Sequence, residues 1–326
     1  MSKRRAVGQF SDAPPLGKLT PSRGSALDEV KSAGVLIIGI GNMGGGMAAN
    51  LLAKGWNVLV NDIDSEKVEK LVSKGAVSLS IRAQKAPESI AFMAITAVIV
   101  CVVDAAQTED VLFGDHGLAH SLPSGHTVVL CPTILPQEVE SFASRLAERG
   151  IHTIDAPMSG GPARAADGSM SLLVACPQAV FAQQAGLLNS LSSKVFNISE
   201  KPGDAARTKL VNNLLAGINL VGAAEALALA GKLGLDLTKT LDVIEQSSGQ
   251  SWIGSDRMRR ALVGDYAPRA HVTLLEKDTR LALVCAAAAG FEGPLGKAAS
   301  GVFAQAHAAG FAEQDDAAVF KLLSGK

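Results

Sequence analysis

The sequence predicts two domains: a doubly wound α/β domain comes first, an all-α domain follows, and one long helix joins them. Short apolar runs alternate with helical or loop segments as far as about residue 200, which is the pattern of βα units with right-handed crossovers. From Asp204 onward the strand patterns disappear. Between these regions lies a stretch of about 29 residues without a proline, rich in Ala and Leu, which is long enough for one helix.

Residues 1–33 are predicted to form a flexible N-terminal extension. They begin with the cations Lys3 to Arg5 and are scattered with prolines and glycines. No apolar segment of a secretory signal occurs, and Asp12 disfavours a transit peptide. We therefore divide the chain into this extension, an α/β domain over residues 34–200 and a helical domain over residues 201–326.

The composition excludes several classes of partner. Thirty Lys and Arg stand against 31 Asp and Glu, which gives no electrostatic basis for binding nucleic acid or an anionic membrane. Hydrophobic residues make up 48% of the chain but aromatic residues only 4%, so Ala, Leu and Val must build the core. The four cysteines lie far apart without a CxxC motif, and we expect reduced thiols in a cytoplasmic protein.

The first element in the chain is a short apolar strand, residues 35–38, which opens directly into Gly39-Ile40-Gly41-Asn42-Met43-Gly44 and then into a helical stretch. A GxGxxG motif between a strand and a helix is typical of a dinucleotide-binding Rossmann domain, where the glycines let the backbone approach a pyrophosphate. Asp62 follows a second strand, residues 58–60, and a carboxylate there accepts hydrogen bonds from the adenosine ribose. Asp62 therefore favours NAD over NADP, although NADP remains possible.

The remaining strands are predicted at residues 97–103, 127–131, 151–154, 171–175 and 195–198. Ligands of such sheets bind outside the carboxyl ends of the strands, so the segments after these runs are candidate site segments: Val103-Asp104, Pro132-Thr133 and 155–162. In the last of these, Ser159 offers a hydroxyl, and Gly160 and Gly161 expose backbone N–H groups. This arrangement suits a carboxylate, although an isolated Ser-Gly-Gly is also an ordinary turn.

The long helix is predicted over residues 202–234, with Asp204 capping its first turn. At 100° per residue, Asn213 and Asn212 lie about 40° and about 60° from Lys209 on either side, so one amine and two amides share a face. A buried amine loses its proton more easily, which suits proton transfer. Residues 210–230 could also span a bilayer, but three Asn and Glu225 favour a buried helix between domains.

The second domain is predicted to contain helices over residues 237–246, 255–263, 272–289, 294–309 and 315–323. Lys277 and Asp278 fall inside one of them, where adjacent side chains point to different faces, so a solvated charge pair is an alternative to a site. His116 and His120 have a helical spacing that would suit zinc, but the surrounding Gly and Pro favour a loop. We predict no metal site.

The four motifs together resemble the β-hydroxyacid dehydrogenase family, which includes 3-hydroxyisobutyrate dehydrogenase and 2-hydroxy-3-oxopropionate reductase. The resemblance extends from Val35 to the end of the chain and rests on the glycine motif, the segment 155–161, Lys209 with Asn213, and Lys277-Asp278. It implies that Lys209 is the catalytic lysine, that Asn213 orients the substrate, and that Ser159, Gly160 and Gly161 bind it. It also implies that Thr133 and Lys277 lie on the cofactor side.

The chain departs from the family at several positions around the implied pocket. Val102 and Val103 stand where a Leu-Pro pair is usual, Pro132 replaces a Ser before Thr133, and Ala205 replaces a Gly four residues before Lys209. These differences do not change the reaction that the resemblance implies, but they leave the identity of the substrate open. The resemblance places Val102 and Val103 beside the cofactor.

We therefore expect an NAD-dependent oxidoreductase that interconverts a small β-hydroxy acid and its semialdehyde, with Lys209 as general acid and base. A threonate-type sugar-acid dehydrogenase or an imine reductase of the same fold is an alternative, although imine-reducing relatives generally lack the lysine. A non-catalytic NAD-binding scaffold is a third possibility. The apolar helical domain suggests a homodimer or homotetramer.

Overall fold

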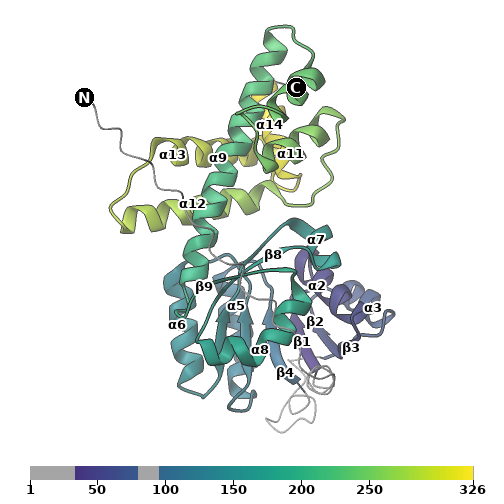
Figure 1. Ribbon diagram of the computed structural model, residues 1–326, viewed down its shortest axis with the longest axis vertical. Helices are drawn as coiled ribbons and strands as arrows, with labels where there is room; N and C mark the ends of the chain where they lie inside the picture. Colours follow the sequence, from purple (N-terminus) through teal and green to yellow (C-terminus); the bar gives the residue numbers. More distant parts are fainter. Residues whose placement is uncertain (1–33, 80–94, 326) are drawn as a thin grey trace, which may run out of the picture.

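The computed structural model describes residues 34–79 and 95–325 of the chain. The predicted extension, residues 1–33, lies outside these ranges. An α/β domain and a helical domain lie one above the other, and one long helix runs between them (Figure 1). The predicted fold class is therefore confirmed.

A single sheet forms the centre of the α/β domain. Its strands are β1 (Gly34–Ile38), β2 (Val58–Asn61), β3 (Val77–Ser78), β4 (Ile95–Val100), β5 (Thr127–Leu130), β6 (His152–Asp155), β7 (Met158–Ser159), β8 (Ser171–Ala175) and β9 (Lys194–Ser199). The strand order is β3-β2-β1-β4-β5-β6-β8-β7, and β9 pairs with β8. The strands from β3 to β6 are parallel.

The far end of the sheet differs from a wholly parallel arrangement. β8 is antiparallel to both β6 and β7, and β9 is parallel to β8. The segment between β6 and β8 contains only β7 and one short helix, α7 (Gly161–Asp167). A parallel crossover usually needs a connection of a dozen or more residues built on a full helix, so this segment turns back instead. The sequence analysis did not anticipate the reversal.

Helices cover both faces of the sheet: α2 (Asn42–Ala53), α3 (Ser65–Val72), α5 (Ala105–Phe113), α6 (Pro136–Ala147) and α8 (Gln178–Leu191). Val35 and Ile37 of β1 belong to one hydrophobic core, while Leu36 and Ile38 belong to the other. Successive side chains of a strand point to opposite faces, so an uninterrupted apolar strand serves both cores. His116 lies in a turn and His120 in a short 3₁₀ segment (Leu118–His120), as the loop prediction requires.

The helix α9 (Asp204–Lys232) joins the domains. The predicted cap by Asp204 is wrong, because Asp204 is already the first helical residue and its carboxylate accepts hydrogen bonds from Ser199 and Arg207. The first turn is capped from the sheet instead. Asp155, at the end of β6, accepts hydrogen bonds from the backbone N–H groups of Gly203 at 2.7 Å and Ala206 at 3.0 Å.

The helical domain is built around the C-terminal part of α9. Its other helices are α10 (Leu237–Glu245), α11 (Trp252–Leu262), α12 (Val272–Ala288), α13 (Pro294–Ala306) and α14 (Val319–Ser324). Leu220, Ala224 and Leu227 of α9 lie in the core of this domain. In the part of the chain that the structure describes, α9 alone has the length and hydropathy of a membrane span, yet its side chains contribute to this core and to the cores beside the sheet.

Candidate active site

The glycine turn after β1 has the geometry of a phosphate-binding turn. Gly39 has φ +83°, and a Cβ there would lie 2.6 Å from the Cys101 carbonyl oxygen. A Cβ on Gly44 would overlap the Gly39 carbonyl oxygen, so this glycine allows α2 to pack against the turn. Gly41 is different, because nothing lies within 4 Å of the position of a Cβ. Gly39 thus permits a tight turn, Gly44 permits close helix packing, and the space beside Gly41 is open.

Asp62 holds this turn against the end of β2. Its carboxylate accepts hydrogen bonds from the Ile40 N–H at 2.7 Å and from the Asp64 N–H at 2.9 Å. Ile63, beside it, is 97% exposed. Lys67, which the sequence analysis did not consider, lies nearby, but it forms an ion pair with Asp64 at 3.0 Å. The segment therefore presents mainly carboxylates, as a ribose site does.

The other residues of the predicted cofactor side lie around the same turn. Asn42 is the exposed first residue of α2, and Met43 packs against the core beside the sheet. Val102 follows β4, and its Cγ1 would lie 3.1 Å from a Cβ on Gly39. Val103 is half-exposed, and its N–H donates to the Gln107 side chain.

The Ser159 turn follows β6 directly. Ser159 is half-buried in β7, Gly160 has φ +128° and Gly161 has φ +79°. These values lie in the left-handed region that glycine adopts without strain. No atom lies within 4 Å of the place where a Cβ of Gly161 would be. Backbone N–H groups beside a hydroxyl in such a turn can bind an anionic oxygen.

Lys209 and Asn213 are buried in α9, and each is only 7% exposed. The Lys209 amine makes no hydrogen bond or ion pair to any residue that the structure describes. Burial lowers the pKa of Lys209, the neighbouring Lys277 lowers it further, and Asp278 raises it. Asn212 is exposed, so of the two predicted amides only Asn213 shares the buried environment of the amine.

A polar network surrounds this amine. The Asn213 Nδ2 donates to Asp278 Oδ2 at 2.6 Å, and Lys277 Nζ donates to the Thr133 carbonyl oxygen at 2.5 Å. Lys277 Nζ also lies 2.9 Å from Asp278 Oδ1, in ion-pair contact but without hydrogen-bond geometry. Lys277 and Asp278 leave α12 in different directions, as adjacent helical residues do, but the long lysine side chain bends back to its neighbour, and with side chains only 18% and 9% exposed the two do not form a solvated charge pair.

The structure thus brings Lys209, Asn213, Lys277 and Thr133 together at the junction of the two domains. Ser159 makes no hydrogen bond to Lys209 or Asn213 among the described residues. Asp155, four residues before Ser159 in the sequence, links this segment to α9, because its carboxylate accepts hydrogen bonds from the first turn of that helix. Sequence reasoning gave no role to Asp155 or Asp278. The sequence signal that could have indicated a role for Asp278 was its position directly after Lys277.

The four cysteines are free thiols, as predicted. Burial raises the pKa of Cys101 to about 12 and that of Cys176 to about 11. Such thiols stay protonated at neutral pH and are poor nucleophiles. Among residues 34–79 and 95–325, no cluster of His, Cys, Asp and Glu side chains could hold a metal ion.

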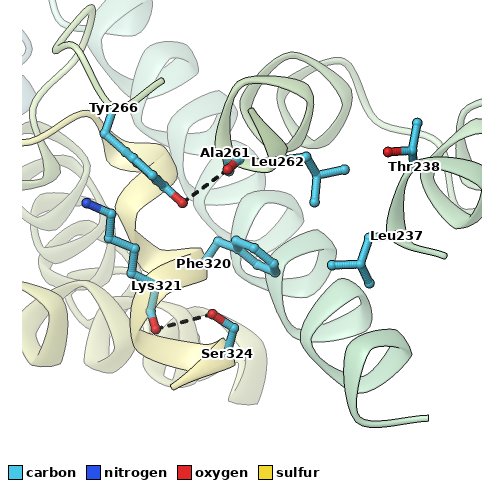
Figure 2. Close-up of a pocket in the computed structure, with 8 residues that line it drawn as sticks. All are labelled: Leu237, Thr238, Ala261, Leu262, Tyr266, Phe320, Lys321 and Ser324. Atoms are coloured by element: carbon cyan, nitrogen blue, oxygen red, sulfur yellow. Dashed lines mark hydrogen bonds between the residues drawn. The ribbon is translucent and has the colours of Figure 1, made fainter. Parts of the chain in front are cut away.

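A separate cavity of about 240 Å³ lies in the helical domain, between α10, α11 and α14 (Figure 2). None of the predicted site residues lines it. Tyr266 donates its hydroxyl to the Ala261 carbonyl oxygen, and Ser324 donates to that of Lys321 (Figure 2). These two hydroxyl groups are already paired with backbone, and the cavity is not part of the candidate active site.

A dinucleotide turn in a Rossmann domain, together with a buried amine at the junction to a helical domain, defines a nicotinamide-dependent dehydrogenase. Residues 34–199 match the family model described as the NAD binding domain of 6-phosphogluconate dehydrogenase. Residues 203–323 match the one described as the NAD-binding domain of NADP-dependent 3-hydroxyisobutyrate dehydrogenase. The chain belongs to the β-hydroxyacid dehydrogenase family.

Individual relatives agree with this assignment. L-threonate dehydrogenase of Cupriavidus necator is 36% identical over 294 residues, which cover 90% of this chain and 97% of the relative. 3-Hydroxyisobutyrate dehydrogenase of Pseudomonas aeruginosa is 34% identical over 304 residues, with 90% and 99% covered. A crystal structure of 3-hydroxyisobutyrate dehydrogenase from Salmonella typhimurium has a TM-score of 0.80 at 34% identity and covers 88% of this chain and 99% of that one.

Proposed function

We propose that this dehydrogenase oxidises a hydroxy acid with NAD, that Lys209 is its general acid and base, and that a threonate-type sugar acid is its first substrate candidate. The lysine Lys209, buried at the domain junction with only the charge of Asp278 to favour its ammonium form, is the observation that carries the proposal. Burying an amine costs free energy, so its retention at a domain junction points to a ligand.

The residues of the site divide the work of proton transfer. A bound nicotinamide would supply or accept the hydride. In oxidation the neutral Lys209 amine takes the alcohol proton, and in reduction the ammonium returns it to the carbonyl oxygen. Because burial lowers the pKa of Lys209, the neutral form is reached at a lower pH than in a solvent-exposed lysine. Asn213 donates one amide hydrogen to Asp278, which leaves the second for the reacting oxygen.

The Ser159 turn is proposed to hold the substrate carboxylate. The Ser159 hydroxyl and the N–H groups of Gly160 and Gly161 are hydrogen-bond donors, and no side chain fills the space beside Gly161. With its carboxylate fixed there, the substrate would present its reacting carbon toward Lys209 and the nicotinamide. Asp155 holds the Ser159 turn and α9 at a fixed separation. It is the last residue of β6, the strand that precedes this turn, and its carboxylate binds the backbone of α9.

The cofactor is proposed to bind along the glycine turn. A dinucleotide pyrophosphate fits the open side of Gly41, where the positive end of α2 faces it. The Asp62 carboxylate keeps lone pairs for the ribose hydroxyls while it holds the turn. Its charge would repel a 2′-phosphate, which favours NAD, with NADP as the second choice.

The substrate is proposed from the relatives. The L-threonate dehydrogenases are 34–36% identical to this chain, and the 3-hydroxyisobutyrate dehydrogenase of Pseudomonas aeruginosa is 34% identical. A panel of L-threonate and 3-hydroxyisobutyrate with NAD or NADP, and of 2-hydroxy-3-oxopropionate with NADH or NADPH, followed at the absorbance of the reduced coenzyme, tests the proposal. We expect turnover of L-threonate with NAD. A protein that binds NADH but turns over none of these acids would overturn it.

We also propose that the protein is a homodimer or homotetramer. Val211 and Leu215 on α9 are 70% and 57% exposed, and Phe291 and Leu295 near α13 are 62% and 63% exposed. Large apolar side chains in such number on one domain are typical of an oligomer interface. Light scattering that finds a monomer at micromolar concentration would contradict this proposal.

A further inference from the structure

Arg164 reaches from the α/β domain to the helical domain. It belongs to α7, the short helix that begins at Gly161, and its guanidinium carbon lies 5.0 Å from the ring centroid of Trp252. Trp252 is the first residue of α11 and is 50% exposed. An arginine over an aromatic ring is attracted by the ring quadrupole, and the contact limits the directions that the guanidinium can take.

A second arginine against the same ring has a different environment. The guanidinium carbon of Arg257 lies 6.0 Å from the Trp252 centroid, but its Nε is 2.5 Å from Asp316 and its Nη1 is 2.5 Å from Asp256. Arg164 interacts electrostatically with Asp167, three residues further along the chain, but its side chain forms no hydrogen bond or ion pair within 4.0 Å in the described ranges. Its five N–H groups are therefore available to a ligand, whereas several of those of Arg257 are already used.

The side chain of Arg164 also lies against the Ser159 turn. A Cβ on Gly160 would be 2.9 Å from Arg164 Cδ, so the arginine stem covers this glycine. The guanidinium carbon is only two bonds beyond Cδ. A molecule whose carboxylate sits at Ser159 and Gly160 would therefore have the guanidinium within reach of its remaining oxygen atoms.

We propose that Arg164 is a specificity-determining residue that binds hydroxyl oxygens of the substrate outside the reacting centre, so that polyhydroxylated acids are preferred to acids with a methyl group there. This inference rests on the proposed function. A guanidinium donates hydrogen bonds and accepts none, so hydroxyl oxygens satisfy it and a methyl group leaves it unpaired. Sites that bind a substrate hydroxyl in this way discriminate strongly against analogues that lack it.

The test compares kcat/KM for L-threonate and for 3-hydroxyisobutyrate in the wild type and in Arg164→Met and Arg164→Lys. Methionine keeps the apolar stem but removes every donor. We expect the ratio of the two kcat/KM values to fall by about 10- to 100-fold in Arg164→Met, mainly through the KM for L-threonate. Lysine keeps a charge but only three donors, and we expect a smaller fall.

Arg145→Met is the matched control. Arg145 also stacks on an aromatic ring, with its guanidinium carbon 3.6 Å from the Phe113 centroid, but it lies on α6 and pairs with Glu109. The substitution therefore removes the same kind of contact, away from the site, and we expect the ratio of the two kcat/KM values to stay the same.

The outcomes separate this inference from the proposed function. An equal loss for both acids in Arg164→Met, an unchanged ratio in both variants, or a wild type that prefers 3-hydroxyisobutyrate would overturn the role of Arg164. A wild-type protein that oxidises neither acid with NAD or NADP would instead overturn the proposed function itself.

Discussion

The connection between Asp155 and the first turn of α9 gives a prediction about both stability and catalysis. Asp155 is 1% exposed and accepts hydrogen bonds from two buried backbone N–H groups, those of Gly203 and Ala206. Alanine at this position would leave both donors unsatisfied, at roughly 1–3 kcal/mol each. We expect Asp155→Ala to lower the free energy of unfolding by about 2–6 kcal/mol at about pH 4, where the wild-type carboxyl is uncharged and bears no ionisation cost.

The same change should reach the active site. Lys209 lies five residues after Asp204, which is less than two turns from the helix end that Asp155 holds. A loosened first turn moves the amine relative to the Ser159 turn, so kcat should fall while the affinity for NADH changes little. Urea unfolding and steady-state kinetics measure the two effects.

Asp155→Asn separates hydrogen bonding from charge. The amide oxygen still accepts, and the amide is uncharged like the protonated carboxyl, so we expect this variant to unfold within about 1 kcal/mol of the wild type at about pH 4. Burial raises the pKa of Asp155 from 3.8 to about 6. Because the pKa is higher in the folded state, the folded protein binds this proton more tightly than the unfolded chain does. The free energy of unfolding of the wild type therefore falls as the pH rises from 3.8 to about 6.

The wild type should therefore lose up to about 3 kcal/mol relative to Asp155→Asn between about pH 4 and about pH 7. Equal stability of Asp155→Ala and the wild type at about pH 4, or a stability difference between the wild type and Asp155→Asn that does not change with pH, would refute the reasoning.

Three further predictions concern the cofactor turn and the amine. Gly44→Ala should destabilise the free protein, because the new Cβ would overlap the Gly39 carbonyl oxygen. Gly41→Ala should keep the melting temperature but weaken NADH binding, since only a ligand would contact the new Cβ. Fluorescence titration of both variants checks this. Asp62→Ser should lower the kcat/KM preference for NAD over NADP by about tenfold or more, measured with both coenzymes. Asp278→Asn removes a charge that raises the pKa of Lys209, so the acid limb of the oxidation pH profile should move to lower pH; an unmoved limb would contradict this.

The sequence was informative where a signal is local. The strand, glycine turn and helix from Gly34 onward follow one another directly, and the proline-free stretch that forms α9 identifies itself by length. The start of α11 was also available from the sequence. Ser251 caps it by accepting a hydrogen bond from the Gly254 N–H, so the helix begins at Trp252 and not at Ser255.

The missed features depend on contacts between distant segments. Asp155 caps α9 because the end of β6 contacts the start of the helix. The local sequence offers only Asp204 as a capping residue, so it gives no reason to choose the distant Asp155. The pairing of Asp278 with Asn213 joins α12 to α9, and the contact of Arg164 with Trp252 joins the two domains. Spacing along one element cannot reveal such neighbours, because the tertiary packing of other elements determines them.

A single-turnover measurement of hydride transfer in Lys209→Ala, combined with NADH titration, examines the proton-transfer role most directly. Lys232→Ala, an exposed lysine at the other end of α9, is the control. We predict that Lys209→Ala binds NADH with nearly unchanged affinity while hydroxy-acid oxidation slows by about 100-fold or more, and that the control keeps both. Oxidation by Lys209→Ala at the wild-type rate would contradict the assignment of this amine as the general acid and base.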